Sequence, residues 1–128
     1  MNDKPVILAV GTQCAPELEE KFNNWYNGTH VPMLLESKWL DVVTRYKLAP
    51  IAQDKLAPAT QDRLAPITQA EYPKYLAIYE FKNRQAFEAW TSCPEFIAAI
   101  KETGETWAED RFELKWMVLY EPMKTWHK

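Results

Sequence analysis

The spacing of hydrophobic residues predicts a chain that begins with a strand followed by a helix. Val6–Gly11 is a short apolar run, typical of a strand that is buried on both faces. Pro16 suits the first position of a helix. The apolar residues after it recur at helical spacing and share one face, namely Leu18, Phe22, Trp25 and Tyr26. Gly28 weakens this helix, and Pro32 permits a short second helix over Met33–Ser37.

The rest of the pattern completes the order β-α-β-β-α-β. Trp39–Leu48 and Tyr75–Phe81 are rich in aromatic and branched residues and predict two strands. Asn83 is a favourable cap for a second helix. Ser92 and Glu95 form an S-x-x-E capping pattern, so we expect the helix to restart there and to end near Gly104.

The last strand has the clearest alternation and bears on the oligomeric state. One face is predicted to carry Phe112, Leu114, Trp116, Val118 and Tyr120, and the other Met117 and Leu119. A sheet covered by helices on one side needs only one apolar face, yet the first and last strands are apolar on both. We therefore expect an α+β fold, an antiparallel sheet with helices on one face, that pairs with a second copy sheet to sheet.

A repeated octapeptide lies between the second and third strands. Lys47–Asp54, Lys55–Asp62 and Arg63–Gln69 are near copies of K/R-L-A-P-x-x-Q-D. A proline every eight residues forbids one continuous helix. The interpretation is an insertion at about residues 47–72 in a single domain spanning 1–128. It is either a duplicated surface loop of little energetic cost, a flap over the pocket, or an arm that grips a partner subunit.

Composition narrows the classes of partner. The 128 residues carry a net charge of −3 and no basic run, which argues against nucleic acid. No apolar run is long enough for a membrane span or a signal sequence, so we expect a cytoplasmic protein. Cys14 and Cys93 stand alone and predict buried thiols, not a disulfide or a metal site. Without clustered His and carboxylate spacing, the sequence predicts neither a metal nor another cofactor.

Candidate chemistry gathers in Trp25–Pro32, the segment WYNGTHVP. On a helix, Tyr26 and His30 would lie four apart on one face and share a pocket wall. Imidazole titrates near neutral pH and serves as a general acid or base, and a tyrosine hydroxyl can donate a hydrogen bond to a substrate oxygen. His127, near the chain end, is a poor catalytic candidate.

These residues resemble the EthD-like and related dimeric α+β barrel proteins. That group often shows W-Y-x-x-x-H-x-P followed by leucines, matched here by Trp25, Tyr26, His30 and Pro32, with Leu34 and Leu35 after them. The element order extends the resemblance over the chain apart from the repeat insertion and the tail after Pro122. The resemblance implies a ferredoxin-like subunit in a dimeric barrel, with a pocket between sheet and helices.

The resemblance also implies a function. Such proteins include cofactor-independent isomerases, lyases, dehydratases and decarboxylases of small cyclic or aromatic metabolites, with His30 as general acid/base and Tyr26 assisting. Aromatic residues are candidates for the walls of a substrate pocket: Trp25, Tyr46, Trp90, Trp116 and Tyr120. Asp41 and Glu80 are candidate carboxylates for orienting His30 if they point inward.

Two alternatives remain open at the level of sequence. His30 could have the purely structural role of capping the end of the first helix. The protein would then bind a small hydrophobic ligand without transforming it, or the histidine would have no functional role. A cofactor-free or heme-handling monooxygenase of the same superfold is the other alternative. Fold alone does not choose between them.

Overall fold

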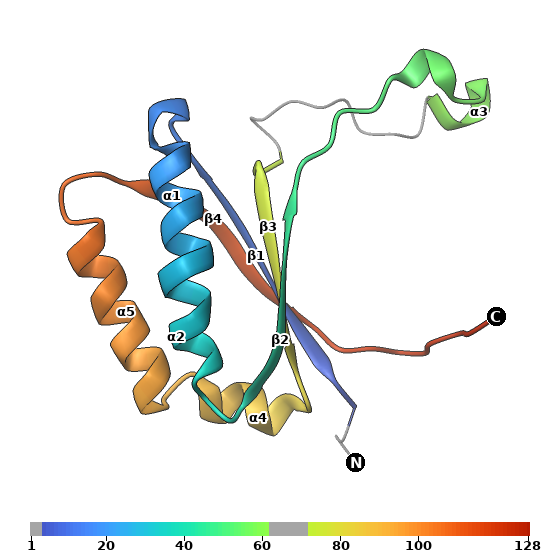
Figure 1. The fold of residues 1–128 in the computed structure, drawn as a ribbon. Helices are drawn as coiled ribbons and strands as arrows, with labels where there is room; N and C mark the ends of the chain where they lie inside the picture. The colour runs from blue at the N-terminus through green and yellow to red at the C-terminus, as the bar shows by residue number, and fades with distance from the viewer. Residues whose placement is uncertain (1–3, 62–71) are drawn as a thin grey trace.

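The computed structural model of the chain describes residues 4–61 and 72–128 as a four-stranded antiparallel sheet with helices on one face (Figure 1). The strands lie in the order β2-β3-β1-β4. Their bounds are β1 (Val6–Cys14), β2 (Leu40–Lys47), β3 (Tyr75–Phe81) and β4 (Phe112–Tyr120). The predicted β-α-β-β-α-β order and ferredoxin-like fold are confirmed.

The helical segments follow the predicted places with altered bounds. They are η1 (Pro16–Leu18), α1 (Glu19–Trp25), η2 (Tyr26–His30), α2 (Val31–Leu35), α4 (Arg84–Trp90) and α5 (Pro94–Thr106). Two short turns lie in the insertion, η3 (Gln53–Lys55) and α3 (Pro58–Gln61). No helix within residues 4–61 and 72–128 is both long and apolar enough to cross a membrane.

The hydrophobic core lies between the sheet and α1, α2 and α5. Alternate residues of β1 and β3 point into it, and each of these side chains is buried: Val6, Leu8, Val10, Tyr75, Ala77, Tyr79 and Phe81. The helices contribute Phe22, Trp25, Leu34 and Trp90, all buried. This period of two along the strands is the pattern expected of a sheet with one covered face.

The first helix continues past Gly28 into the second one, whereas the sequence predicts a helix weakened at Gly28 and a separate short helix over Met33–Ser37. The chain widens into a single π-helical turn, η2, in which the N–H of Val31 donates to the carbonyl of Tyr26, five residues earlier. The helix then continues as α2 with Pro32 in its first turn, where a missing N–H costs no hydrogen bond. Such π turns inside helices occur frequently at functional sites.

The last strand carries a bulge that changes which side chains share a face. Gly11 pairs with Trp116, but Thr12 pairs with Leu114, so Lys115 is the extra residue. A bulge reverses the alternation beyond it. The predicted single face of β4 is therefore wrong. The face toward the helices carries Phe112, Leu114, Met117 and Leu119.

The helix caps agree with the sequence at one position and differ at another. The Asn83 side chain accepts a hydrogen bond from the Ala86 N–H at 2.8 Å, as predicted for a cap. The S-x-x-E interpretation is wrong: α5 begins after Cys93, and the Ser92 hydroxyl donates back to the Ala89 carbonyl. Gly104 lies inside α5, which runs on to Thr106.

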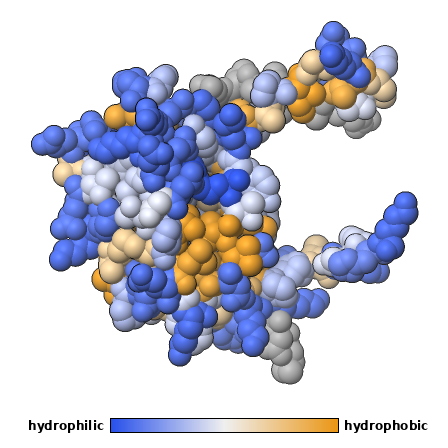
Figure 2. Space-filling view, in the orientation of Figure 1, coloured by the Kyte–Doolittle hydropathy of each residue, from blue (hydrophilic) through white to orange (hydrophobic). Residues whose placement is uncertain are grey.

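No helix of the described residues, 4–61 and 72–128, covers the other face of the sheet (Figure 1). We call it the open face, and it exposes apolar side chains from β2 and β4: Val42, Tyr46, Trp116, Val118 and Tyr120. Figure 2 shows hydrophobic residues gathered beside the sheet, on the side from which the insertion and the C-terminal tail project.

The described part of the insertion, residues 48–61, leaves the sheet on the side away from α1, α2 and α5 (Figure 1). Its base continues the β2–β3 ladder, because the Leu48 N–H donates to the Lys74 carbonyl at 2.7 Å. The third octapeptide, Arg63–Gln69, lies wholly outside the described residues. The described part points away from the helix-covered side, which gives no support to a flap over a pocket there.

Candidate active site

A cavity of about 190 Å³ lies between the sheet and the helices, next to His30. Its walls are almost entirely apolar, and they come from β1, β3, β4, the first helical run and α4–α5. The lining residues are Leu8, Val10, Tyr26, His30, Leu34, Tyr79, Trp90, Phe96, Ile100, Thr103, Phe112, Leu114 and Met117. A 150 Å³ apolar cavity in another protein accommodates benzene, so this one has room for roughly one ring with a substituent.

The π turn sets the position of His30. In a regular α-helix, residues five apart point about 140° away from each other, because each residue turns about 100°. Here Trp25 and His30 are five apart, yet their rings stack with centroids 4.6 Å apart. Tyr26 meets the same imidazole edge to face at 5.0 Å. His30 is therefore held between two aromatic rings of its own helix.

His30 is neutral at physiological pH. Its pKa is lowered from the usual 6.5 to about 4, mainly by burial; the charge of Glu102 opposes this shift and the charge of Arg45 adds to it. The Glu102 carboxylate is fixed nearby by the Trp25 indole, whose Nε1–H donates to Oε1 at 2.8 Å. A neutral imidazole has one nitrogen with a proton and one that accepts.

Thr103 indicates which nitrogen carries the proton. Its hydroxyl donates to the Ala99 carbonyl at 2.7 Å, so its single hydrogen is already used. The same oxygen lies 3.5 Å from His30 Nδ1 and can only accept there. This geometry favours a proton on Nδ1 and leaves Nε2 as the acceptor. His30 does not cap the helix end, because the helix continues into α2.

Two of the residues that line the cavity, Tyr26 and Tyr79, are joined through their hydroxyl groups. The hydroxyl oxygens of Tyr26 and Tyr79 are 2.5 Å apart, and both side chains are buried. Burial raises the pKa of both phenols above the usual 10, so both stay protonated at neutral pH. One hydroxyl donates to the other, and the second keeps a hydrogen that can be offered to a ligand oxygen.

Arg45 supports this pair from the edge of the sheet. Its guanidinium carbon lies 4.2 Å from the centroid of the Tyr26 ring, within cation–π range. Its two terminal nitrogens donate to Asn27 Oδ1 at 2.8 Å and Asn23 Oδ1 at 3.0 Å. The arginine thus ties β2 to the first helix and fixes the ring of Tyr26.

The structure brings together three of the residues predicted from sequence and separates the others. Tyr26, His30 and Trp90 line the cavity, and Trp25 supports His30 from the core. Three further aromatic candidates lie elsewhere in the subunit: Tyr46 lines a polar groove at the β2 edge, Trp116 lies against Gly11, and Tyr120 lies on the open face.

The two carboxylates proposed to orient His30 do not reach it. Asp41 is exposed at the start of β2, where the pairing with β3 is irregular, and Glu80 lines a hollow on the open face. Glu102 is the carboxylate whose charge acts on His30.

Sequence reasoning missed Tyr79, Glu102 and Thr103. The signal for Tyr79 was its place in the alternation of Tyr75–Phe81, which puts it on the inner face of β3. Thr103 follows Phe96 and Ile100 at helical spacing, and all three line the cavity. Neither pattern by itself indicates chemistry.

The cysteines are not part of this site. Cys93 is buried at the start of α5, as expected, and its thiol lies 3.5 Å from the Ser37 hydroxyl oxygen. Burial raises the pKa of the half-buried Cys14 above 9, which disfavours the reactive thiolate. In the part of the chain that the structure describes, no three His, Cys, Asp or Glu side chains form a group suited to a metal ion.

The fold is shared with several solved structures of low sequence identity. An EthD family protein from Bacillus halodurans has a TM-score of 0.60 at 15% identity, over 96% of this chain and 100% of that one. A hydroxynitrile lyase from Passiflora edulis has a TM-score of 0.60 at 14% identity, over 98% and 99% of the two chains. A DABB family protein with a ferredoxin-like fold from Mesorhizobium loti has a TM-score of 0.58 at 11% identity, over 94% and 99%. The predicted resemblance to this group is confirmed at the level of fold.

Sequence comparison gives a family without a described activity. No curated protein matches the chain. The sequence pattern of a family described as a domain of unknown function, DUF4286, matches residues 5–121, which is nearly the whole chain. The chain belongs to the DUF4286 family.

Proposed function

We propose that this protein is a cofactor-independent enzyme that moves a proton on a small cyclic or aromatic metabolite, with His30 as the general base and acid. The observation that carries the proposal is that a neutral histidine and a hydrogen-bonded pair of tyrosines line the same apolar cavity. A general base must be unprotonated when substrate arrives, and a pKa of about 4 meets that requirement at pH 7.

The arrangement supports a specific order of events. A ligand carbonyl oxygen accepts a hydrogen bond from the Tyr26–Tyr79 pair, and His30 Nε2 removes a proton from the adjacent carbon. The electron pair of the broken C–H bond moves toward the carbonyl oxygen, where the hydroxyl stabilises the developing charge. The imidazolium then returns the proton elsewhere on the substrate, or protonates a leaving group. Isomerase, lyase and dehydratase reactions can share this removal of a proton from carbon. In a decarboxylase the C–CO₂ bond breaks instead, the carbonyl oxygen takes up the electron pair, and His30 would only deliver a proton to the carbon that lost CO₂.

The fold neighbours agree with a lyase-type reaction without specifying it. One of them is a hydroxynitrile lyase, whose reaction type matches the class proposed here. The cavity volume favours a ligand with one ring over a porphyrin, so it does not favour the heme-handling alternative.

We further propose that the working form is a homodimer packed through the open face. Tyr46, Trp116 and Tyr120 expose 52%, 39% and 59% of their surfaces there, and aromatic residues are enriched at protein interfaces. Pairing the sheets would cover them at a sheet-to-sheet distance of about 10 Å.

Hydrogen–deuterium exchange into probe compounds tests the catalytic proposal. The protein is incubated in D₂O with a panel of cyclic ketones, aryl-substituted ketones and aromatic hydroxynitriles, and mass spectrometry follows deuterium uptake or cleavage. We expect the wild-type chain to accelerate one of these reactions and His30→Gln to lose at least about 100-fold, the usual contribution of a general acid or base. Turnover retained in a folded His30→Gln variant would overturn the role of His30.

Ligand binding without turnover is the second candidate, favoured by the almost wholly apolar lining of the cavity. If the protein only binds its ligand, the ketones and hydroxynitriles of the panel should bind with equal affinity to the wild type and to His30→Gln. Neither protein should then promote deuterium uptake. Calorimetric titration of the same compounds distinguishes the two functions.

A further inference from the structure

The C-terminal segment Glu121–Lys128 extends from β4 without forming a helix or strand and leaves the sheet on its open side (Figure 1). It carries two large apolar side chains that its own subunit does not bury. Met123 is 92% exposed and Trp126 is 76% exposed. Exposed apolar side chains indicate an interaction site when they belong to one contiguous patch.

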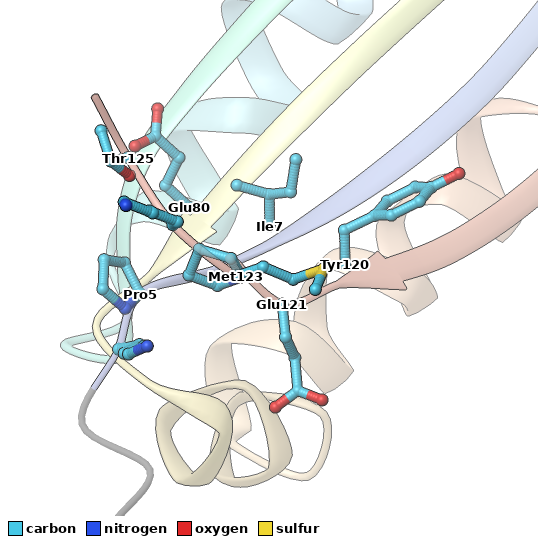
Figure 3. Close-up of a pocket in the computed structure, with 10 residues that line it drawn as sticks. Pro5, Ile7, Glu80, Tyr120, Glu121, Met123 and Thr125 are labelled. Atoms are coloured by element: carbon cyan, nitrogen blue, oxygen red, sulfur yellow. The ribbon is translucent and has the colours of Figure 1, made fainter. Parts of the chain in front are cut away.

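The base of this segment arches over the open face and leaves an apolar hollow of about 480 Å³ beneath it. Figure 3 shows Ile7, Tyr120 and Met123 around this hollow, with Pro5 at its edge. Glu80 and Lys124 contribute charged groups to the same hollow. It adjoins the exposed aromatic surface of β4, so hollow and open face form one continuous apolar surface.

We infer that a second copy of this chain occupies the open face, and that each copy lays its C-terminal segment across the other. The inference rests on the proposed homodimer and adds to it an exchanged segment. A two-fold interface is self-complementary, so the hollow of each copy is available to the segment of the other.

The length of the segment fits this arrangement. Packed sheets lie about 10 Å apart, and an extended chain covers about 3.3 Å per residue. Pro122–Thr125, which line the hollow of their own subunit, are therefore long enough to cross the gap. Trp126 falls in the part that reaches the partner. Pro122 restricts the backbone at the start of the crossing and reduces the entropy lost on docking.

The exposed area is also sufficient. An aromatic side chain presents about 150–250 Å² when fully exposed, so Tyr46, Trp116, Tyr120 and Trp126 together offer roughly 500 Å² at their observed exposures. Val42, Val118 and Met123 bring the apolar surface toward the roughly 800 Å² per partner of a standard stable interface.

Sedimentation of the full chain and of a chain ending at Glu121 tests the inference. We expect the full chain to be dimeric at low micromolar concentration and the shortened chain to have a dimer Kd raised at least tenfold, with an unchanged circular dichroism spectrum. The double variant Met123→Ala/Trp126→Ala should also raise the dimer Kd. It replaces the shortened chain in the test if the shortened chain fails to fold. Ile97→Ala is the matched control, because Ile97 is 59% exposed on α5, which covers the opposite side of the sheet.

Fluorescence gives an independent reading of Trp126. Subtracting the emission spectrum of Trp126→Phe from that of the wild type gives the emission of Trp126. This emission should be blue-shifted in the dimer and should shift to longer wavelength when dilution produces the monomer. A dimer Kd that changes less than twofold on shortening, or an exposed Trp126 spectrum in the dimer, overturns the exchange and leaves the homodimer in place. A full chain that is monomeric at 100 µM overturns both. None of these outcomes bears on His30, whose role is tested by turnover.

Discussion

The rings of Trp25 and His30 stack at 4.6 Å although the two residues are five positions apart. Only the wide turn at Tyr26–His30 allows this alignment, because a regular helix would direct them to different faces. The stack is part of the burial that keeps the imidazole neutral. It therefore connects a local backbone irregularity to the protonation state on which the proposed reaction depends.

The first prediction concerns stability and pH. The pKa of His30 is about 4 in the folded chain and 6.5 when unfolded, so between these values the unfolded state binds more protons. The free energy of unfolding should therefore fall as pH drops from 6.5 toward 4, by about 1.4 kcal/mol per unit and by about 3 kcal/mol in all. Above pH 6.5 this contribution is fully present.

Urea unfolding of the wild type and His30→Gln across pH 4–8 measures this dependence. Glu19, whose pKa is lowered mainly by its hydrogen bond from Lys74, also destabilises the fold at low pH but contributes equally to both proteins. The difference between the two curves isolates His30. Parallel curves would mean that the imidazole is not held neutral by burial.

The second prediction concerns the Tyr26–Tyr79 pair. Either Phe substitution leaves one buried hydroxyl without its partner, which costs about 1–3 kcal/mol of unfolding free energy. The double substitution removes both hydroxyls, so its cost should be smaller than the sum of the two. A double-mutant cycle by chemical denaturation should give a coupling of about 1 kcal/mol or more.

Tyr72→Phe is the control for this cycle, since Tyr72 is 41% exposed and its hydroxyl is absent from the cavity wall. It should change stability by less than about 0.5 kcal/mol. Additive effects of the two buried substitutions would contradict a shared hydrogen bond.

The third prediction concerns Thr103 as a positioning residue for His30. Thr103→Val keeps the shape but removes the oxygen that accepts from Nδ1. Once a turnover substrate is found, we expect kcat to fall by about tenfold with little change in KM, since orientation and tautomer are lost while the cavity wall remains. Thr103→Ser should restore most of kcat. A Val variant with normal kcat would show that the 3.5 Å contact does not orient the ring.

Much of the fold could be predicted from sequence because it depends on periodicity. Tyr75–Phe81 was predicted with its observed bounds, since apolar residues at alternate positions can be buried only by a strand over a core. β4 was predicted as a strand, but its faces were wrong beyond Lys115. A bulge depends on how two strands fit together, and that information is not contained in one strand.

The site was harder to predict than the fold. Tyr26 and His30 were identified from the motif, and their shared cavity agrees with their spacing. The π turn, Tyr79 and Thr103 were not, because each acquires its role through contacts with distant parts of the chain. Tyr79 is 53 positions from the hydroxyl it contacts, and Thr103 is 73 from the imidazole.

The fourth prediction compares two helix starts. Asn83→Ala removes the acceptor for the Ala86 N–H and should cost about 1 kcal/mol of unfolding free energy, measured by urea denaturation. Ser92→Ala, which follows the sequence pattern of a cap but does not cap α5, should cost less than about 0.5 kcal/mol. Equal costs at the two positions would restore the S-x-x-E interpretation.

The fifth prediction compares two glycines with opposite surroundings. A Cβ on Gly104 would meet nothing within 4 Å, and the residue lies inside α5, so Gly104→Ala should raise the free energy of unfolding by about 1 kcal/mol through helix propensity. A Cβ on Gly11 would lie 2.7 Å from Pro73 Cγ and 2.9 Å from the Trp116 ring. Gly11→Ala should therefore lower the free energy of unfolding by about 1–3 kcal/mol, because the Trp116 ring or the Pro73 ring must move. Thermal and urea unfolding of both variants measures the two signs, and a neutral Gly11→Ala would mean that Trp116 does not rest on β1 as described.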